Sequence, residues 1–222
     1  MQLIGYITTV LVAYLLGSIP TGFLVGKARG LDIRKVGSGN IGATNVFRSL
    51  GKGLGALVMA VDVAKGYAAC QVVARLGRYY FFPTDPDQEF TLEVLGIIAG
   101  IAAILGHNYT CWLNFKGGKG VATTGGVLLG LLPGASAISF GVWLVVLALT
   151  RYVSVASIAA AISLPLGVWC SNVIRHHSDK TLIIVAAALG ALGIYKHKAN
   201  IQRLCKGTEH RFGKKKDSES TQ

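Results

Sequence analysis

Charged residues are scarce in this chain of 222 residues. Only 14% are Asp, Glu, Lys or Arg, whereas a soluble domain carries about 25%. Four segments contain no charged residue at all: 3–26, 94–115, 120–150 and 152–174. About 20 residues of helix cross the hydrocarbon core of a bilayer. The scarcity excludes an ordinary soluble domain and indicates an all-α polytopic membrane protein, because a chain in lipid must satisfy its own backbone.

Paired cysteines and clusters of metal ligands are also missing. The four cysteines, Cys70, Cys111, Cys170 and Cys205, show no CxxC spacing, which argues against a disulfide framework or a metal site. No acidic or histidine cluster has ligand spacing in the polar segments, so neither a metal nor another cofactor is expected. The first apolar segment lacks the basic residues and the cleavage site of a signal peptide, and we expect it to be a span.

The number of spans depends on segment 120–150. As one helix it would be about 46 Å long, which is too long for an upright span, and Pro133 interrupts it. If it forms two helices and the N-terminus is outside, 17 of the 22 Lys and Arg residues face the cytoplasm and 4 face outward, whereas one crossing gives 10 against 11. The positive-inside rule favours two helices. The prediction is seven transmembrane helices, at about 3–26, 53–76, 92–111, 120–132, 135–150, 152–174 and 181–197.

The formal net charge of +12 does not indicate nucleic-acid binding, because basic residues of membrane proteins gather in cytoplasmic loops. Membrane lipid is the expected surrounding, and no nucleic-acid partner is expected. The sequence predicts one integral membrane domain over 1–212 and a disordered polar tail over 213–222. The N-terminus is expected outside, and the C-terminus and both polar loops in the cytoplasm. The oligomeric state stays open, with a monomer as the working expectation.

Two glycine-rich polar segments interrupt the apolar sequence, "GSGNIGATN" at 37–45 and "FKGGKGVATTGG" at 115–126. The first follows a predicted membrane helix instead of a strand, and the second lacks P-loop spacing, so neither nucleotide motif applies. Glycines let backbone N–H groups converge on an anion, and a following helix adds its dipole. Phosphate ligands are predicted among Gly37, Ser38, Gly39, Asn40, Thr44, Asn45, Arg48, Lys116, Gly117, Gly118, Lys119 and Gly120.

The alternative for these glycines is close helix packing, as small residues allow in membranes. Packing explains the glycines along the spans, but it does not explain the Asn, Ser, Lys and Arg gathered in the two loops. Ionisable residues inside a span are expensive and tend to be paired or functional. Asp62 and Lys65 lie three residues apart on one helical face. Two interpretations stay open: the two residues form an ion pair within the bundle, or one of them supports the cytoplasmic site from its membrane side.

Two histidine positions are also informative. His107 ends a span and is interpreted as an interfacial or packing residue. His197 lies three residues before Asn200, so both side chains would project from one helical face on the cytoplasmic side. This pair is the best candidate for polar contacts to a molecule bound at a site.

Three segments in order, "GSGNIGATNVFRSLG", "HNYTCWLNFKGGKGVAT" and "RYVSVASI…YKHKANIQRLCKGTEHRF", closely resemble signature segments of the PlsY family. These are bacterial acyl-phosphate:glycerol-3-phosphate acyltransferases, and the likeness extends from about Leu11 to Phe212. The resemblance implies an enzyme of phospholipid biosynthesis in the inner membrane. It would transfer a fatty acyl group from acyl phosphate to the 1-hydroxyl of glycerol 3-phosphate, which gives lysophosphatidic acid and phosphate.

The resemblance also implies roles for individual residues. The catalytic set would be Ser38, Arg48, Lys119, His197 and Asn200, and Ser157 would contact phosphate. Lys119 and loop N–H groups would stabilise the phosphates and the developing oxyanion, while the other four would hold glycerol 3-phosphate.

No Ser-His-Asp arrangement is evident, which disfavours a covalent acyl-enzyme; the base is His197 or the substrate's own phosphate, and the resemblance favours the phosphate. Where the family has proline three residues after the second-motif histidine, this chain has Thr110, so the shape of that turn is in doubt.

Two other classes are disfavoured. A transporter would place polar groups near the bilayer midplane and show internal repetition, whereas the polar groups here gather at one face, apart from Asp62 and Lys65. An acyltransferase that uses a CoA or carrier-protein donor typically carries H-x-x-x-x-D, and no histidine in this chain has that partner.

Overall fold

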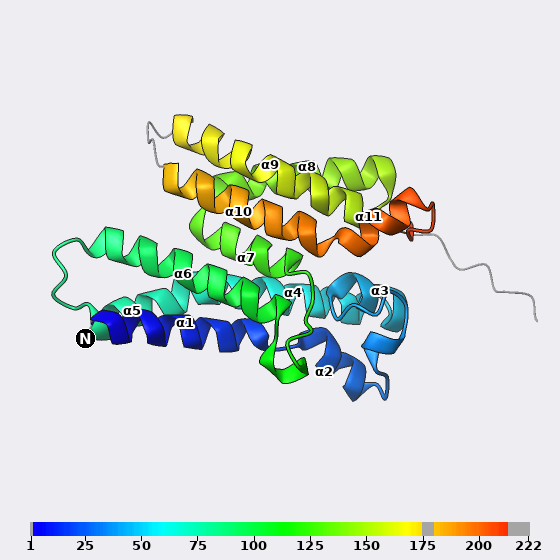
Figure 1. Cartoon of the computed structure of the whole chain (residues 1–222), viewed down its shortest axis with the longest axis horizontal. Helices are drawn as coiled ribbons and strands as arrows, with labels where there is room; N and C mark the ends of the chain where they lie inside the picture. Colours follow the sequence, from blue (N-terminus) through cyan, green and yellow to red (C-terminus); the bar gives the residue numbers. More distant parts are fainter. Residues whose placement is uncertain (1, 175–179, 213–222) are drawn as a thin grey trace, which may run out of the picture. The chain divides into compact units, whose positions relative to one another are not determined.

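The computed structural model describes residues 2–174 and 180–212, and every regular element within them is helical (Figure 1). The first part of the chain forms α1 (Gln2–Ser18), α2 (Thr21–Ala28), η1 (Ile33–Lys35), α3 (Ala43–Leu50), α4 (Lys52–Ala68), the π-helical η2 (Ala69–Val73), α5 (Ala74–Phe81), α6 (Gln88–Asn108), η3 (Cys111–Leu113) and α7 (Val121–Leu131). The second part forms α8 (Pro133–Thr150), α9 (Val153–Ile174), α10 (Lys180–Lys196) and α11 (Lys198–Cys205). The predicted tail at 213–222 lies outside the described residues.

Apolar helices of membrane-spanning length account for most of the predicted spans. Five segments qualify by length and composition: Gln2–Ala28, Lys52–Phe81, Gln88–Leu113, Pro133–Thr150 and Val153–Val173. A sixth consists of α10 and α11, which are bent by 54° at their junction, and α7 is a shorter apolar helix of 11 residues. Each predicted range overlaps one of these segments. The all-α membrane fold is therefore confirmed, and the count of seven holds approximately because α7 is short.

The break predicted at Pro133 is confirmed. Helix α7 ends at Leu131, Leu132 leaves helical geometry with φ −138° and ψ 65°, and Pro133 opens α8. Proline suits a first helical position because the missing N–H would have no partner there. Segment 120–150 is therefore two helices.

The chain packs into two compact units, residues 1–133 and 134–222. In the first unit, α1 lies against α6 and α4 lies against α7. Both contacts bring backbones together: a β-carbon on Gly17 would collide with the Ala103 carbonyl, and one on Gly126 with the Val63 carbonyl. Small residues allow such an approach between membrane helices. The packing interpretation of the glycines along the spans is correct here.

In the second unit, α9 packs against α10, and Gly190 faces the Ala161 carbonyl with too little room for a larger residue. Residue Ala135 of α8 lies against Gly167 of α9. The prediction of one domain over 1–212 stays a prediction.

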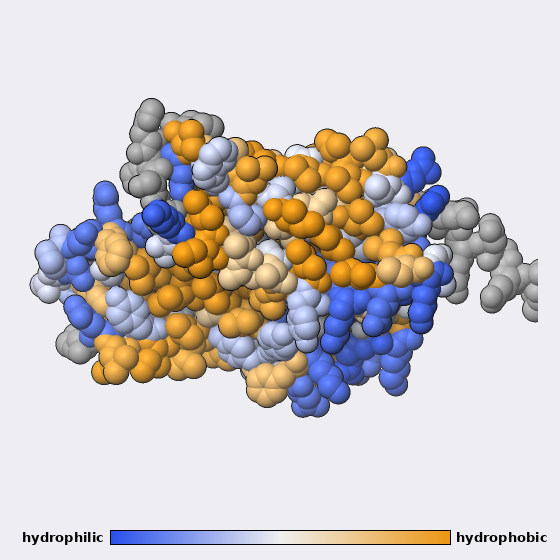
Figure 2. Space-filling model, turned by 45° about the horizontal axis from the view of Figure 1, so that its top comes forward, coloured by the Kyte–Doolittle hydropathy of each residue, from blue (hydrophilic) through white to orange (hydrophobic). Residues whose placement is uncertain are grey.

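The surface carries many apolar side chains. Leu3, Leu149 and Ile184 are 72%, 80% and 68% exposed, and hydrophobic residues cover most of the face in Figure 2. Hydrophilic residues gather in that view at the end that carries α2 and α3. An apolar exterior of this extent suits lipid as the surrounding solvent.

Candidate active site

The first glycine loop is organised around the side chain of Asn45, which is 1% exposed. Its Nδ2 lies 3.0, 3.1 and 2.9 Å from the carbonyl oxygens of Ile33, Val36 and Asn40, and its Oδ1 accepts from the Ser38 N–H at 2.9 Å. One amide therefore holds four points of the loop from inside. The predicted role of Asn45 as a substrate ligand stays a prediction, and the structure adds a role in positioning the loop.

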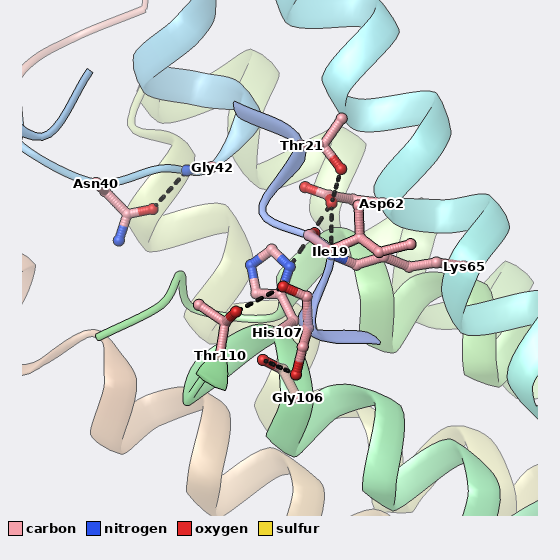
Figure 3. Close-up of polar contacts among 10 residues, drawn as sticks. Ile19, Thr21, Asn40, Gly42, Asp62, Lys65, Gly106, His107 and Thr110 are labelled. Atoms are coloured by element: carbon pink, nitrogen blue, oxygen red, sulfur yellow. Dashed lines mark hydrogen bonds and ion pairs between the residues drawn. The ribbon is translucent and has the colours of Figure 1, made fainter. Parts of the chain in front are cut away.

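Glycine is required at Gly37 in this loop. Its φ is +59°, in the left-handed region, and a β-carbon there would collide with Asn45 Oδ1. The Asn40 side chain accepts from the Gly42 N–H at 2.8 Å (Figure 3), and α3 begins at the next residue. The loop thus leads directly into a helix N-terminus, where backbone N–H groups favour an anion.

The predicted ligands of the first loop are accessible to different degrees. Ser38 and Thr44 are half-buried, and Arg48 is exposed on α3. Asp32, before the loop, is paired with Arg34 by two side-chain hydrogen bonds of 2.9 and 2.8 Å. Those bonds from Arg34 lower the pKa of the Asp32 carboxyl to about 2. The negative charge of Asp32 is therefore neutralised by its neighbour Arg34.

The second glycine loop folds back onto the end of α6. The N–H groups of Gly117 and Gly118 donate to the carbonyls of Asn108 and His107 at 3.2 and 3.0 Å. A β-carbon on Gly118 would collide with the His107 ring. These glycines allow a close approach to α6, which is the role that the packing alternative gave to glycines in the spans; their predicted role toward substrate stays a prediction.

Lys119 lies at the exit of this turn. The following residue, Gly120, has φ +75° and caps α7, so Lys119 directly precedes a helix N-terminus. Lys119 is half-buried, whereas Lys116 on the other side of the glycines is exposed. Of the two lysines, Lys119 therefore has the more restricted environment.

Thr110 keeps the geometry of the proline that it replaces. Its φ of −64° equals the value that a proline ring imposes. Its hydroxyl donates to the Ser18 carbonyl at 2.6 Å (Figure 3), and it accepts from the Trp112 N–H at 3.3 Å. Thr110 thus has a φ that proline could also adopt, and its hydroxyl binds the end of α1, which a proline could not do.

In the second unit, one carboxylate that was not predicted from the sequence, that of Glu209, binds three polar side chains. Glu209 is 9% exposed and accepts from Ser154 Oγ at 2.8 Å, Asn200 Nδ2 at 2.7 Å and Arg203 Nε at 2.7 Å. Burial would raise the pKa of the Glu209 carboxyl, but the hydrogen bonds from Asn200, Ser154 and Arg203 outweigh burial and hold that pKa below its ordinary value of 4.5.

His197 and Asn200 do not share a continuous helix. His197 caps α11 at the 54° bend after α10, and its Nδ1 lies 2.8 Å from the Gly193 carbonyl. Both side chains are buried, at 3% and 6% exposure. Ser157 Oγ donates to the Val153 carbonyl at 2.8 Å and accepts from Trp143 Nε1 at 3.2 Å. Each unit thus carries part of the predicted set.

Within residues 2–174 and 180–212, no three His, Cys, Asp or Glu side chains come together as metal ligands. The polar groups near the two glycine loops are instead amides, hydroxyls and basic side chains. Such groups suit phosphate, and Arg and Lys supply full charges to it.

These features define a polytopic helical membrane protein with two glycine-rich turns that lead into helix N-termini. Residues 7–207 match the glycerol-3-phosphate acyltransferase family. A protein of that name from Desulforamulus reducens is 43% identical over 95% of this chain and 98% of its own length, and one from Synechococcus sp. (strain JA-3-3Ab) is 42% identical over 91% of each. The chain belongs to the glycerol-3-phosphate acyltransferase family.

Solved structures agree with this assignment. The glycerol 3-phosphate form of PlsY, an integral membrane glycerol 3-phosphate acyltransferase, is 42% identical, with a TM-score of 0.77 over 94% of this chain and 96% of that one. The lysophosphatidic acid form of PlsY is 41% identical, with a TM-score of 0.75 over 94% and 95%.

The Glu209 cluster generates a pH-dependent prediction. A carboxyl whose pKa is lowered by folding stabilises the protein above its unfolded pKa, and this contribution is lost as the pH falls through the folded value. We expect the melting temperature in detergent to fall below about pH 4.5. Glu209→Gln, which keeps the size and removes the charge, should lower the melting temperature at pH 7 by a few degrees and reduce its dependence on acid. The exposed Glu89→Gln, at the start of α6, is the matched control; equal acid profiles for both variants would contradict the prediction.

Proposed function

We propose that this chain transfers a fatty acyl group from acyl phosphate to the 1-hydroxyl of glycerol 3-phosphate, giving lysophosphatidic acid and phosphate. One observation carries the proposal: in the first unit, two glycine-rich turns each lead into a helix N-terminus, with Lys119 directly before α7 and Arg48 in the last turn of α3. Two anion-binding turns suit a reaction between two phosphate-bearing substrates. The glycerol 3-phosphate and lysophosphatidic acid forms of PlsY support the acceptor and the product.

The reaction needs positioning more than chemical activation. Acyl phosphate is a mixed anhydride, and its carbonyl is attacked by the 1-oxygen of glycerol 3-phosphate. A new ester C–O bond forms, the bond between the carbonyl carbon and the phosphate oxygen breaks, and phosphate leaves with the electron pair. Fixed charges and oriented donors lower the barrier of such a step. No covalent acyl-enzyme is required.

Roles follow for the predicted residues. Lys119 and the backbone N–H groups at the start of α7 stabilise the donor phosphate and the carbonyl oxygen as it becomes negative, with Gly117, Gly118 and Gly120 shaping the turn that presents them. In the first loop, Ser38 and Arg48 hold the phosphate of glycerol 3-phosphate, with Gly37, Gly39, Asn40, Thr44 and Asn45 shaping the loop around it.

In the second unit, His197 and Asn200 orient the glycerol hydroxyls, and Ser157 contacts phosphate. The Gly193 carbonyl can only accept, so His197 donates from Nδ1 and the neutral ring has its lone pair on Nε2. The donor phosphate takes the hydroxyl proton as it leaves.

The donor is tested with purified protein and labelled glycerol 3-phosphate. We expect lysophosphatidic acid from palmitoyl phosphate and none detectable from palmitoyl-CoA at the same concentration. An acyl-CoA donor would need contacts to a nucleotide and a pantetheine arm, and a thioester needs stronger activation than a mixed anhydride. Inorganic phosphate should compete with the donor as a released product. Robust product formation from palmitoyl-CoA alone would refute the donor assignment.

Lys119 and Lys116 form a matched pair for the role of the second loop. Lys119→Ala should lower kcat/KM at least about 10²-fold, or about 2.7 kcal/mol of transition-state stabilisation. Lys116→Ala should have a smaller effect, because the Lys116 side chain is exposed and precedes the glycines in the chain. Equal and mild effects would mean that both lysines serve membrane orientation.

We also propose the bacterial inner membrane as the location, with the N-terminus outside and the C-terminus and the site in the cytoplasm. This orientation places 17 of the 22 basic residues on the cytoplasmic side, as the positive-inside rule requires.

Cys205 reports this orientation, since it is exposed at the C-terminal end of α11. In a variant that keeps Cys205 as the only cysteine, an impermeant maleimide should label the protein in inverted vesicles and leave it unlabelled in intact cells. Labelling of intact cells would reverse the proposed orientation.

A further inference from the structure

Two ionised side chains are buried within the span Lys52–Phe81. Asp62 is 2% exposed and Lys65 is 4% exposed, and Lys65 Nζ lies 2.9 Å from Asp62 Oδ1. Of the two interpretations of these residues, the ion pair within the bundle is therefore confirmed. A buried ion pair is weak evidence for stability, because desolvation of both charges offsets their attraction. Its position in the fold is more informative than its energy.

The pair is tied to the break between α1 and α2. At this break the Ile19 carbonyl lies outside the helical hydrogen-bond ladder; it accepts from the Thr21 N–H at 3.0 Å and from Lys65 Nζ at 2.9 Å. Thr21, the first residue of α2, donates from Oγ1 to Asp62 Oδ1 at 3.2 Å. One carboxylate oxygen thus receives hydrogen bonds from α2 and from its own helix α4.

The same oxygen also faces α6. His107 Nδ1 lies 3.7 Å from Asp62 Oδ1, and His107 is 5% exposed. Figure 3 shows Thr21, Lys65 and His107 directed toward Asp62 from three separate elements. The Asp62 carboxylate is the point at which α2, α4 and the end of α6 meet.

His107 extends this cluster to the second glycine loop. Its ring lies directly over Gly118, where a β-carbon would collide with Nε2, and its carbonyl accepts from the Gly118 N–H at 3.0 Å. Only one side chain therefore separates Asp62 from the residue that precedes Lys119. The next helix is fixed to α4 as well, because Gly66 leaves no room for a side chain against the Thr123 carbonyl of α7.

We propose that Asp62 is a positioning residue of the transfer reaction, which acts through His107 to fix the second glycine loop and the direction of Lys119. The Asp62 carboxylate orients the His107 imidazole, and the imidazole packs against Gly118. This contact keeps the loop in its turn conformation. Lys65 neutralises Asp62, so the carboxylate can stay ionised inside the span. The inference rests on the proposed role of Lys119 for its effect on catalysis, but not for its effect on the loop.

The first measurement is hydrogen exchange of the peptide that contains Gly117–Val121, in the full chain. Asp62→Asn removes the charge and keeps the shape, and exchange in this peptide should increase. Asp62→Leu/Lys65→Met removes both charges together, so no unpaired charge stays buried, and this variant should also exchange faster. Thr9→Val is the control, because Thr9 is buried on α1 against Gly77, with no hydrogen-bond partner for its hydroxyl among the described residues; its exchange should match the wild type.

The second measurement is steady-state kinetics with palmitoyl phosphate. Displacement of a catalytic group by about 1 Å lowers rates by about 10²-fold, so both Asp62 variants should lose about that factor in kcat. Their KM for glycerol 3-phosphate should stay within about 3-fold, because the acceptor is held elsewhere. Combined with Lys119→Ala, Asp62→Asn should add little further loss, since the group that it positions is already gone.

The outcomes separate the two proposals. Unchanged exchange in the Gly117–Val121 peptide, or additive losses in the combined variant, would overturn the positioning role of Asp62. Wild-type activity of the double variant Asp62→Leu/Lys65→Met would also overturn it, since the ion pair would then have no role in the transfer reaction. If exchange rises in Asp62→Asn while Lys119→Ala keeps full activity, the proposed catalytic role of Lys119 fails and the positioning of the loop stands.

Discussion

The constraint on which the first unit depends is that hydrocarbon offers no hydrogen bonds, so every backbone group exposed by a helix break must find a partner within the protein. The break between α1 and α2 exposes the Ser18 and Ile19 carbonyls. Thr110 binds the first from the end of α6, and Lys65 binds the second from α4. Lys65 in turn requires Asp62 as its counter-charge. The polar cluster inside the span therefore joins the broken first helix to the second glycine loop.

The glycine loops combine two demands that are usually separate. Gly37 and Gly118 are needed because the chain passes too close to a side chain for any β-carbon, Asn45 in one loop and His107 in the other. In the same loops the chain turns into α3 and α7, where the helix N-termini carry partial positive charge. Tight internal packing makes each turn rigid, and a rigid turn presents its donors without reorganisation.

Much of this fold follows from local sequence. Charge-free segments locate the helices, Pro133 marks the break, and the spacing of Asp62 and Lys65 predicts their ion pair. The contributions of Asn45 and Glu209 could not be predicted in the same way. Both side chains turn inward to bind groups brought near by the tertiary fold: Asn45 binds backbone up to twelve residues earlier, and Glu209 binds Ser154 across 55 residues. The bend at His197 between α10 and α11 was not predicted either, because residue spacing assumes an unbroken helix.

Helix α7 has only 11 residues and is about 16 Å long, roughly half the thickness of the hydrocarbon core. Hydrophobic mismatch of this size is met by thinning of the nearby lipid or by polar segments that lie below the surrounding membrane surface. In both cases the distance between acyl chains and the turn at Lys119 becomes shorter. A helix too short to cross the bilayer alone thus brings the turn at Lys119 nearer to the acyl chains of the surrounding lipid.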